Sequence, residues 1–317
     1  MNASSPLLSP PRRVVIDTDC GTDDLIAIAL LASRPDIELI AITTVHGLTR
    51  ALQGADNVRR ILHRLGKPHV PVFSGSEVPI SGVRQFPDEW RVQTETLSGV
   101  HLPALRPFQQ TEAAHQFLAE IFRHSAPTTI FALGPWTNVA IALRSWNRSL
   151  KSQVEILSMG GAIDSPGNVF AESIGSEIAP NAEWNFYLDP VAVNEVLSCG
   201  FPVTLVPLDA TKEAAITPAL VKGLRESPKT EALNFVIEII QSVDNWINEG
   251  HYFAWDVVAA VLLIYPNIGT RSLEKILVQT EGFDAGRVRR SAGGYEVSYF
   301  SSIDAARFEK LLIEGLS

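Results

Sequence analysis

The chain has 317 residues, and 46% of them are hydrophobic, which is enough to bury a large core. Its formal net charge is −9, and because an acidic protein repels phosphate backbones we expect no nucleic acid as a partner. The longest apolar runs, residues 25–32 and 257–264, fall far short of the roughly 20 residues that a membrane span needs. Cys20 and Cys199 suit a reducing compartment, so the composition predicts a cytoplasmic protein without a membrane partner.

Segments with strand-like and helix-like patterns alternate through the first part of the chain. The expected strands are 14–16, 37–45, 70–73, 128–133, 154–159 and 203–206, and the expected helices begin near residues 22, 51, 112, 134 and 189. Pro190 at the first position of the last of these helices supports that boundary. Such alternation is typical of an open, mainly parallel sheet with helices on both faces. The sequence therefore predicts an α/β fold.

The alternation is interrupted twice and gives way to a different pattern near the end. Residues 74–110 are rich in Gly, Pro and Ser, and a loop of that length inside a compact domain is usually functional. Residues 162–183 also have a loop-like composition. Further along we expect helices near 217–225, 231–248 and 254–264, a small β-hairpin over 288–299 that turns at Gly293–Gly294, and a closing helix from Ile303. No repeat or linker is evident, so we expect a frayed leader at 1–12 and one domain over 13–317.

Four carboxylates follow the first expected strand within eight residues: Asp17, Asp19, Asp23 and Asp24. Anions so close together repel one another. A hard cation that takes oxygen ligands could hold them, and so could the N-terminus of the helix that begins here. An EF-hand is excluded because this loop follows a strand, whereas a dehalogenase-type phosphatase is closer, although Cys20 interrupts its Asp-x-Asp-Gly-Thr pattern. The functionless alternative is a solvated acidic turn with a capping aspartate.

Polar residues follow several of the expected strands, not only the first. In open α/β sheets, ligands bind beyond the carboxyl ends of the strands. That rule places the acidic loop, Thr43–Thr44, residues 134–138 and Met159–Gly161 along one edge of the sheet. Residues that are distant in the sequence should therefore converge there, as a catalytic site requires.

Several motifs, taken in this order along the chain, resemble the nucleoside hydrolases, a family of calcium-dependent N-ribohydrolases. They are Asp17–Asp24, Leu133–Asn138, Met159–Gly161, Gly167–Asn168, Ala182–Asn185 with Asp189–Pro190, and the late Asp256. The resemblance covers most of the chain and implies the fold of that family. One position departs from it, because Leu48 follows Gly47 where many members have an asparagine.

The resemblance implies a Ca²⁺ site with an all-oxygen ligand set. Asp19, Asp24 and Asp256 would supply carboxylates, and Thr137 would supply its backbone carbonyl. Asp19 would also act as the general base toward the attacking water. The remaining substrate-binding residues would be Asp23, Met159, Asn168, Glu183, Trp184 and Asn185. A site built to bond the ribose hydroxyls should reject 2′-deoxynucleosides.

Two tryptophans resemble those of members that prefer inosine, adenosine and guanosine. Trp255 stands beside Asp256 where pyrimidine-accepting members typically have a histidine, and Trp90 lies in the matching segment Phe86–Arg91. A purine between two indoles would gain stacking energy and more basic ring nitrogens, so that solvent could protonate the leaving base. His251 is a further candidate to assist the leaving group.

Other functions stay open at this stage. The chain could be a pyrimidine-accepting or non-specific member of the same family, which Trp255 argues against. It could be a magnesium-dependent dehalogenase-type phosphatase, but no downstream lysine with a late acidic pair stands out. A non-catalytic nucleoside-binding protein is a further alternative, with Leu48 as the sign of lost activity. The resemblance also implies a homodimer or homotetramer.

Overall fold

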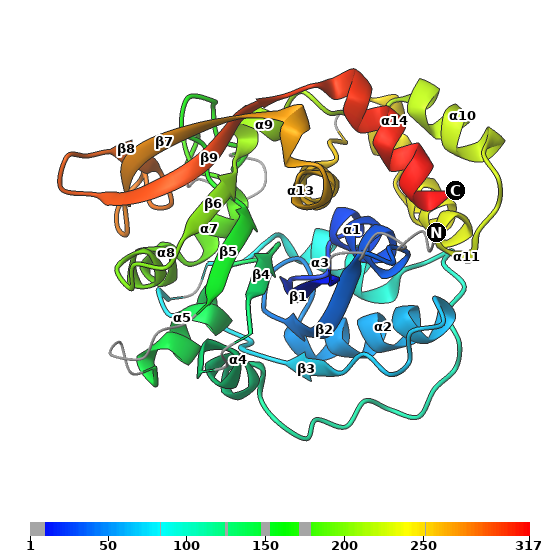
Figure 1. Ribbon diagram of the computed structural model, residues 1–317, viewed down its shortest axis with the longest axis horizontal. Coiled ribbons are helices and arrows are strands. Elements are labelled where there is room, and N and C mark those ends of the chain that lie inside the picture. Colours follow the sequence, from blue (N-terminus) through cyan, green and yellow to red (C-terminus); the bar gives the residue numbers. More distant parts are fainter. Residues whose placement is uncertain (1–9, 83, 124–125, 147–152, 171–178, 251) are drawn as a thin grey trace, which may run out of the picture.

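The computed structural model describes residues 10–317 except 83, 124–125, 147–152, 171–178 and 251. The strands are β1 Arg12–Thr18, β2 Ile37–Thr44, β3 Val72–Ser74, β4 Thr128–Ala132, β5 Val154–Met159, β6 Val203–Val206, β7 Gly269–Val278, β8 Val288–Arg290 and β9 Tyr295–Ile303. These nine strands of the described chain form one sheet in the order β3-β2-β1-β4-β5-β6-β9-β7-β8 (Figure 1). From β3 to β9 in that order every neighbouring pair is parallel, and β7 is antiparallel to both β9 and β8.

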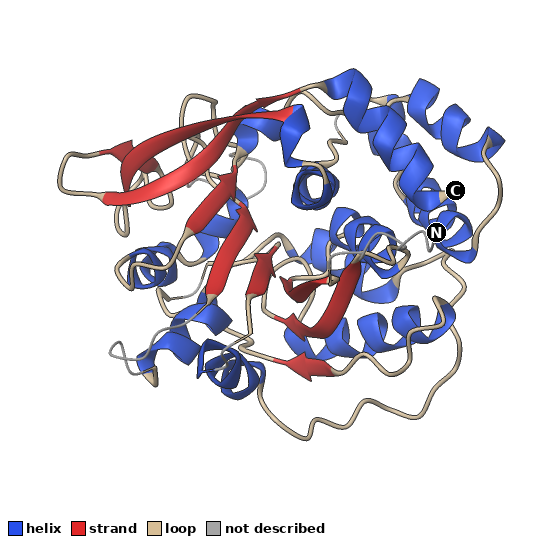
Figure 2. Ribbon diagram, viewed as in Figure 1, coloured by secondary structure: helices blue, strands red, loops and turns tan. Residues whose placement is uncertain are grey.

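Helices flank the sheet on both sides, as Figure 2 shows with helices in blue and strands in red. The helices are α1 Thr22–Ala32, α2 Ala51–Arg64, α3 Asp88–Thr96, α4 Ala114–Arg123, α5 Thr137–Arg144, α7 Trp184–Leu188, α8 Pro190–Leu197, α9 Leu208–Thr211, α10 Pro218–Glu226, α11 Glu231–Ser242, α12 Asp244–Asn248, α13 Trp255–Ile264 and α14 Ala305–Leu316. The predicted α/β fold with an open, mainly parallel sheet is confirmed.

The sheet carries an apolar layer on each face because successive strand residues point to opposite sides. In β1, Val14 and Ile16 belong to one hydrophobic cluster and Val15 belongs to the other. Helices α1, α2, α10, α11, α13 and α14 contribute to the first cluster, and α4, α5 and α8 contribute to the second. The sequence of β1 is apolar at three consecutive positions because both of its faces are covered.

Two central helices, α1 and α13, bring acidic residues to the carboxyl edge of the sheet. Every residue of α1 is buried, and α13 is buried from Asp256 to Leu263, so neither helix has a polar face. The two helices pack against each other. The first turn of α1 contains Asp23 and Asp24, and the first turn of α13 contains Asp256. Positive ends of two helix dipoles therefore lie at this group of carboxylates.

The C-terminal part of the sheet differs from the prediction. Strands β8 and β9 do not pair with each other, although the hairpin expected over 288–299 requires this; both pair with β7, on its two opposite sides. The chain crosses β7 between them, and a Cβ atom added at Gly294 would lie 2.5 Å from the carbonyl oxygen of Ile276. The predicted hairpin is therefore wrong, since the strand over residues 269–278 was not foreseen.

Three boundaries also differ from the prediction. The leader was expected to reach residue 12, but Arg12 pairs with Ile37 at the start of β1, and its guanidinium donates to Glu155 at 2.6 Å. The long stretch 74–110 contains α3, and the helix expected over 231–248 is divided at Val243 into α11 and α12. None of the described helices is both long and apolar enough to cross a membrane.

Candidate active site

A cavity of about 770 Å³ lies at the edge where β1, β4 and β5 end. Asp19 follows β1, Leu133 follows β4 and Met159 ends β5, and all three line this cavity. Most of the predicted site residues line it as well: Asp19, Asp23, Asp24, Trp90, Met159, Asn168, Glu183, Trp184, Asn185, Trp255 and Asp256. The structure thus brings together residues as far apart in the sequence as Asp19 and Asp256. Of the other predicted residues, Thr137 does not line the cavity, and His251 lies outside the described residues.

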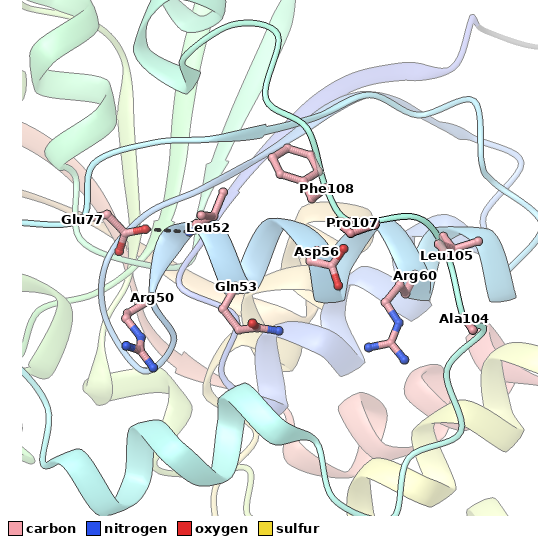
Figure 3. Close-up of a pocket in the computed structure, with 10 residues that line it drawn as sticks. All are labelled: Arg50, Leu52, Gln53, Asp56, Arg60, Glu77, Ala104, Leu105, Pro107 and Phe108. Carbon is pink, nitrogen blue, oxygen red and sulfur yellow. Dashed lines mark hydrogen bonds between the residues drawn. The ribbon is translucent and has the colours of Figure 1, made fainter.

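A second cavity, of about 680 Å³, lies between α2 and the extended segment 104–108 (Figure 3). Its charged groups already have partners within the protein. The carboxylate of Glu77 accepts from the backbone N–H groups of Ala51 and Leu52 at the start of α2, and Arg60 donates to the carbonyl of Pro103 at 3.0 Å. Arg50 is paired with Glu95 at 2.5 Å, so the cavity at the sheet edge is the better candidate.

Three buried carboxylates form the floor of the sheet-edge cavity. Oxygen atoms of Asp23, Asp24 and Asp256 lie within 4.8 Å of one another, which suits a shared metal ion. The backbone N–H of Asp256 donates to Asp23 Oδ2 at 3.2 Å, and the hydroxyl of Thr18 donates to Asp24 Oδ1. Asp256 Oδ1 is buried and has no hydrogen-bond partner among the described residues. An all-oxygen donor set with an unpaired buried oxygen fits a hard cation.

The pKa values of the clustered aspartates also fit a site for a cation. Burial, and then the neighbouring Asp24, raise the pKa of Asp19 and of Asp256 well above the usual range. The same two causes raise the pKa of Asp23 to about 7. Carboxylates gathered without a compensating positive charge resist ionisation, and a bound cation would remove that resistance.

Asp19 lies beside this group and is held by the turn that follows β2. Its Oδ2 accepts from the backbone N–H of Leu48 at 2.9 Å. A Cβ atom at Gly47 would lie 1.9 Å from the same oxygen, so only glycine permits this close approach. Leu48, the position at which the sequence departs from the family resemblance, lines the cavity.

Thr137, whose carbonyl was predicted to bind the metal, does not line the cavity, and its hydroxyl bonds to other side chains. Its hydroxyl donates to Asp189 Oδ2 at 2.6 Å and lies 2.8 Å from His46 Nε2, which must therefore be the donor in that pair. As the first residue of α5, it directs its carbonyl along the helix, away from the N-terminus. The carbonyl of Leu133, whose residue does line the cavity, accepts from Asn185 Nδ2 at 2.8 Å and keeps a second lone pair.

Backbone N–H groups fix the carboxylate of Glu183 at the start of α7. It accepts from Asn185 and Gly161 at 2.9 Å and from Phe186 at 3.2 Å. Burial raises the pKa of Glu183, and these three bonds oppose that shift. Asn168 Oδ1 accepts from the backbone N–H of Trp184 at 3.1 Å, so the loop carrying Asn168 is attached to the same helix.

Aromatic side chains form the other walls of the cavity. The ring of Trp90 lies edge-on to Trp246 at 5.5 Å and to Trp184 at 6.0 Å between centroids. Trp255 contacts Phe253 at 5.8 Å and Tyr252 at 6.1 Å. The prediction did not include Trp246, Tyr252 or Phe253, although four of the ten residues from 246 to 255 are aromatic against 8% in the whole chain. This local enrichment in aromatic residues is the feature of the sequence from which these wall residues could have been predicted.

Comparison with known proteins agrees with the fold. A model of the family described as inosine-uridine preferring nucleoside hydrolase matches residues 14–310. The chain belongs to this family. The family membership and the fold predicted from the sequence are both confirmed.

The relatives of this nucleoside hydrolase have different substrates in their names. Over 287 residues it is 30% identical to probable uridine nucleosidase 1 of Oryza sativa subsp. japonica, covering 89% of this chain and 85% of that protein. The solved plant nucleoside hydrolase PpNRh1 superposes with a TM-score of 0.84 at 25% identity, covering 97% of this chain and 99% of that one. An inosine-guanosine nucleoside hydrolase superposes with a TM-score of 0.80 at 27% identity, covering 96% and 98%.

Proposed function

We propose that this nucleoside hydrolase cleaves the N-glycosidic bond of purine ribonucleosides, with Ca²⁺ as its metal, and releases ribose and the free base. The observation that carries the purine assignment is Trp255, which lines the cavity directly beside Asp256. Such a reaction would serve the recovery of purine bases. The second candidate is a pyrimidine-accepting hydrolase, which the name of the rice relative favours.

Oxygen atoms at the floor of the cavity would hold the proposed ion. Asp24 and Asp256 of the buried cluster would supply carboxylates, together with Asp19 beside it, whereas Asp23 would bind ribose. We assign the carbonyl of Leu133 in place of that of Thr137. The support for Leu133 is its place in the cavity wall and its free lone pair. When bound, the ion supplies positive charge that favours loss of a proton from the attacking water and attracts the ribose hydroxyls.

Asp19 acts as the general base in this proposal. The N–H of Leu48 fixes one of its carboxylate oxygens, so the side chain keeps a defined orientation from which it would accept the proton of the attacking water. Asp23, Asn168, Glu183 and Asn185 bind the ribose hydroxyls. Their orientations are already fixed by hydrogen bonds to the backbone, so little freedom is lost when ribose binds. Positive charge that develops on the ribose is favoured by the surrounding carboxylates.

The aromatic walls hold the base as it leaves. Trp90 and Trp255 both line the cavity, and a purine offers them more stacking area than a pyrimidine does. Stacking against electron-rich indoles makes the ring nitrogens of the purine more basic, so protonation from solvent suffices. His251 is the alternative source of a proton.

Release of ribose from inosine tests this function directly. The purified protein should hydrolyse inosine, adenosine or guanosine with a higher kcat/KM than uridine. A chelator should abolish the activity and added Ca²⁺ should restore it. Equal or faster turnover of uridine would replace the purine assignment with the pyrimidine one, and no release of ribose from any of the four would exclude hydrolysis. The cytoplasmic location and the homodimer or homotetramer stay predictions, and light scattering would measure the latter.

A further inference from the structure

The segment 252–256 is joined to the N-terminus of α1 by a buried hydrogen bond between side chains. The hydroxyl oxygens of Tyr252 and Thr22 lie 2.6 Å apart, although the residues are 230 positions apart in the sequence. Tyr252 is 4% exposed and Thr22 is 9% exposed. Both residues line the cavity but are nearly buried, so removing one hydroxyl group leaves the other without its partner in the protein.

The rest of the segment is held by its backbone. The N–H of Ile216 donates to the carbonyl of Tyr252, and the N–H of Ala254 donates to the carbonyl of Ala214, both at 3.0 Å. These bonds form a short antiparallel ribbon, with Ala215 opposite Phe253. They fix the conformation of the ribbon, whereas the hydroxyl bond of Tyr252 fixes how it lies against α1.

The same segment carries the proposed base-binding residue. The ring centroids of Tyr252 and Trp255 lie 6.1 Å apart with their planes at 67°, an edge-to-face arrangement that depends on orientation. One residue further along, the N–H of Asp256 donates to Asp23 Oδ2 at 3.2 Å. Two bonds thus attach the segment to the first turn of α1, and Trp255 lies between them.

We propose that Tyr252 is a positioning residue for nucleoside binding, because its hydrogen bond to Thr22 holds Trp255 in the orientation that receives the base. This inference rests on the proposed hydrolase function. Without the bond, the segment also populates conformations in which the indole is displaced. Substrate then binds only to the competent fraction, and KM rises by the inverse of that fraction. Once substrate is bound the competent conformation is restored, so kcat changes little.

Kinetics of variants that delete one hydroxyl test the pairing. Tyr252→Phe keeps the ring that contacts Trp255, and Thr22→Val keeps the shape of the threonine. Each should raise KM for inosine about tenfold and leave kcat within about twofold. The double variant should be no worse than either single variant, because both remove the same bond. Effects that multiply in the double variant, or a KM that does not change, would overturn the proposal.

Two further variants serve as controls. Thr22→Ser retains a hydroxyl and should restore most of the wild-type KM. Tyr265→Phe deletes a comparable hydroxyl at the other end of α13, where it accepts from Arg34 at 3.0 Å, and should leave KM unchanged. A variant that merely folds less well would lose active enzyme and therefore show a lower kcat at constant KM, which contradicts the positioning role.

Hydrogen–deuterium exchange gives a measurement that needs no substrate. In Tyr252→Phe the amides of residues 252–257 should exchange about tenfold faster than in the wild type, and in Tyr265→Phe they should not. If exchange is faster in Tyr252→Phe but the wild type is inactive, the proposed hydrolysis is rejected. The conclusion that the hydroxyl bond holds this segment in place would still stand. Unchanged exchange, or faster exchange with unchanged KM, would overturn the positioning role itself.

Discussion

Asp19 has the environment that a general base in this cavity needs. Its side chain is 3% exposed, and the N–H of Leu48 holds one of its oxygens. The glycine before Leu48 is required because any side chain there would collide with that carboxylate. Asp19 could be predicted as a site residue from its motif. The backbone bond that holds it could not, because its donor lies in a turn 28 to 29 residues further along the chain.

We expect Asp19→Asn to lower kcat for inosine by about 10²–10⁴-fold, the usual contribution of general-base catalysis. The amide keeps the size of the side chain but cannot accept the proton. Ribose release at saturating Ca²⁺ and inosine measures the effect. Asp56→Asn, at a residue of α2 paired with Arg59 on the surface, is the control and should retain full activity. A folded Asp19→Asn enzyme within about threefold of wild-type kcat would show that another group takes the proton.

In the proposed function, substrate preference depends on Trp255, which lines the cavity. Removing it by Trp255→Ala should lower kcat/KM for inosine by about tenfold or more, because base stacking contributes about 1–3 kcal/mol. Uridine should lose less, since its ring offers a smaller stacking area. The loss for inosine should appear in kcat as well as in KM, because activation of the leaving base acts in the transition state. Equal losses for the two nucleosides would mean that the indole does not discriminate between them.

Among the elements, α1 and α13 explain why so many carboxylates can be buried together. Their N-termini meet at the cavity floor and direct the positive ends of two helix dipoles toward Asp23, Asp24 and Asp256. The dipoles compensate only part of the charge, since burial still raises the pKa of Asp23 to about 7. These helices therefore bury a group of carboxylates whose remaining charge a bound cation would compensate.

The pH dependence of stability tests whether the buried carboxylates lack a compensating charge. In the metal-free protein the pKa of Asp23 is about 7 in the folded state, against an ordinary value of 3.8. The folded state then binds more protons than the unfolded chain within this window, so the free energy of unfolding falls as pH rises through it. We expect Tm of the metal-free protein to be lower at about pH 8 than at about pH 5, and saturating Ca²⁺ to reduce the difference.

An Asp23→Asn variant separates this effect from the general acidity of the chain. It lacks the titrating carboxyl, so its Tm should depend less on pH than that of the wild type when both are metal-free. Calorimetric scans at the two pH values measure the difference. If the variant and the wild type lose the same number of degrees, the cluster does not control stability in this range.

Strands with a continuous apolar run could be predicted from the sequence. Strands that are recognised only by the strands they pair with could not. The strands 154–159 and 203–206 match β5 and β6 because their apolar runs are buried on both faces. The strand β7 has an exposed leucine, Leu273 at 71%, and its first seven residues include Arg271, Glu274 and Lys275, so it lacks a continuous apolar run. At the site, the aspartates follow directly from the motif. The sequence predicts that Thr137 supplies its carbonyl to the ion, but the direction of that carbonyl depends on where α5 begins, and in the structure α5 begins at Thr137 itself.

At the scale of the whole molecule, the crossing of the chain over β7 distinguishes the structure from the predicted hairpin. Two consecutive glycines, Gly293 and Gly294, occupy the turn in both arrangements. In a two-residue hairpin turn of the common type, both central residues need positive φ. In the structure neither of these glycines has a positive φ. Gly293 faces open space, whereas Gly294 lies against the backbone of Ile276.

Replacing each glycine by alanine therefore tests the topology. Gly294→Ala should lower the free energy of unfolding by about 1–3 kcal/mol, because the added methyl group would lie 2.5 Å from the carbonyl oxygen of Ile276. The turn at residue 294 and strand β7 would then have to move apart. Gly293→Ala should stay within about 0.5 kcal/mol of the wild type, since nothing lies within 4 Å of the added atom. Urea denaturation of the two variants at saturating Ca²⁺ gives both values. Similar destabilisation by both would favour the hairpin, because each alanine would then be forced into a positive φ.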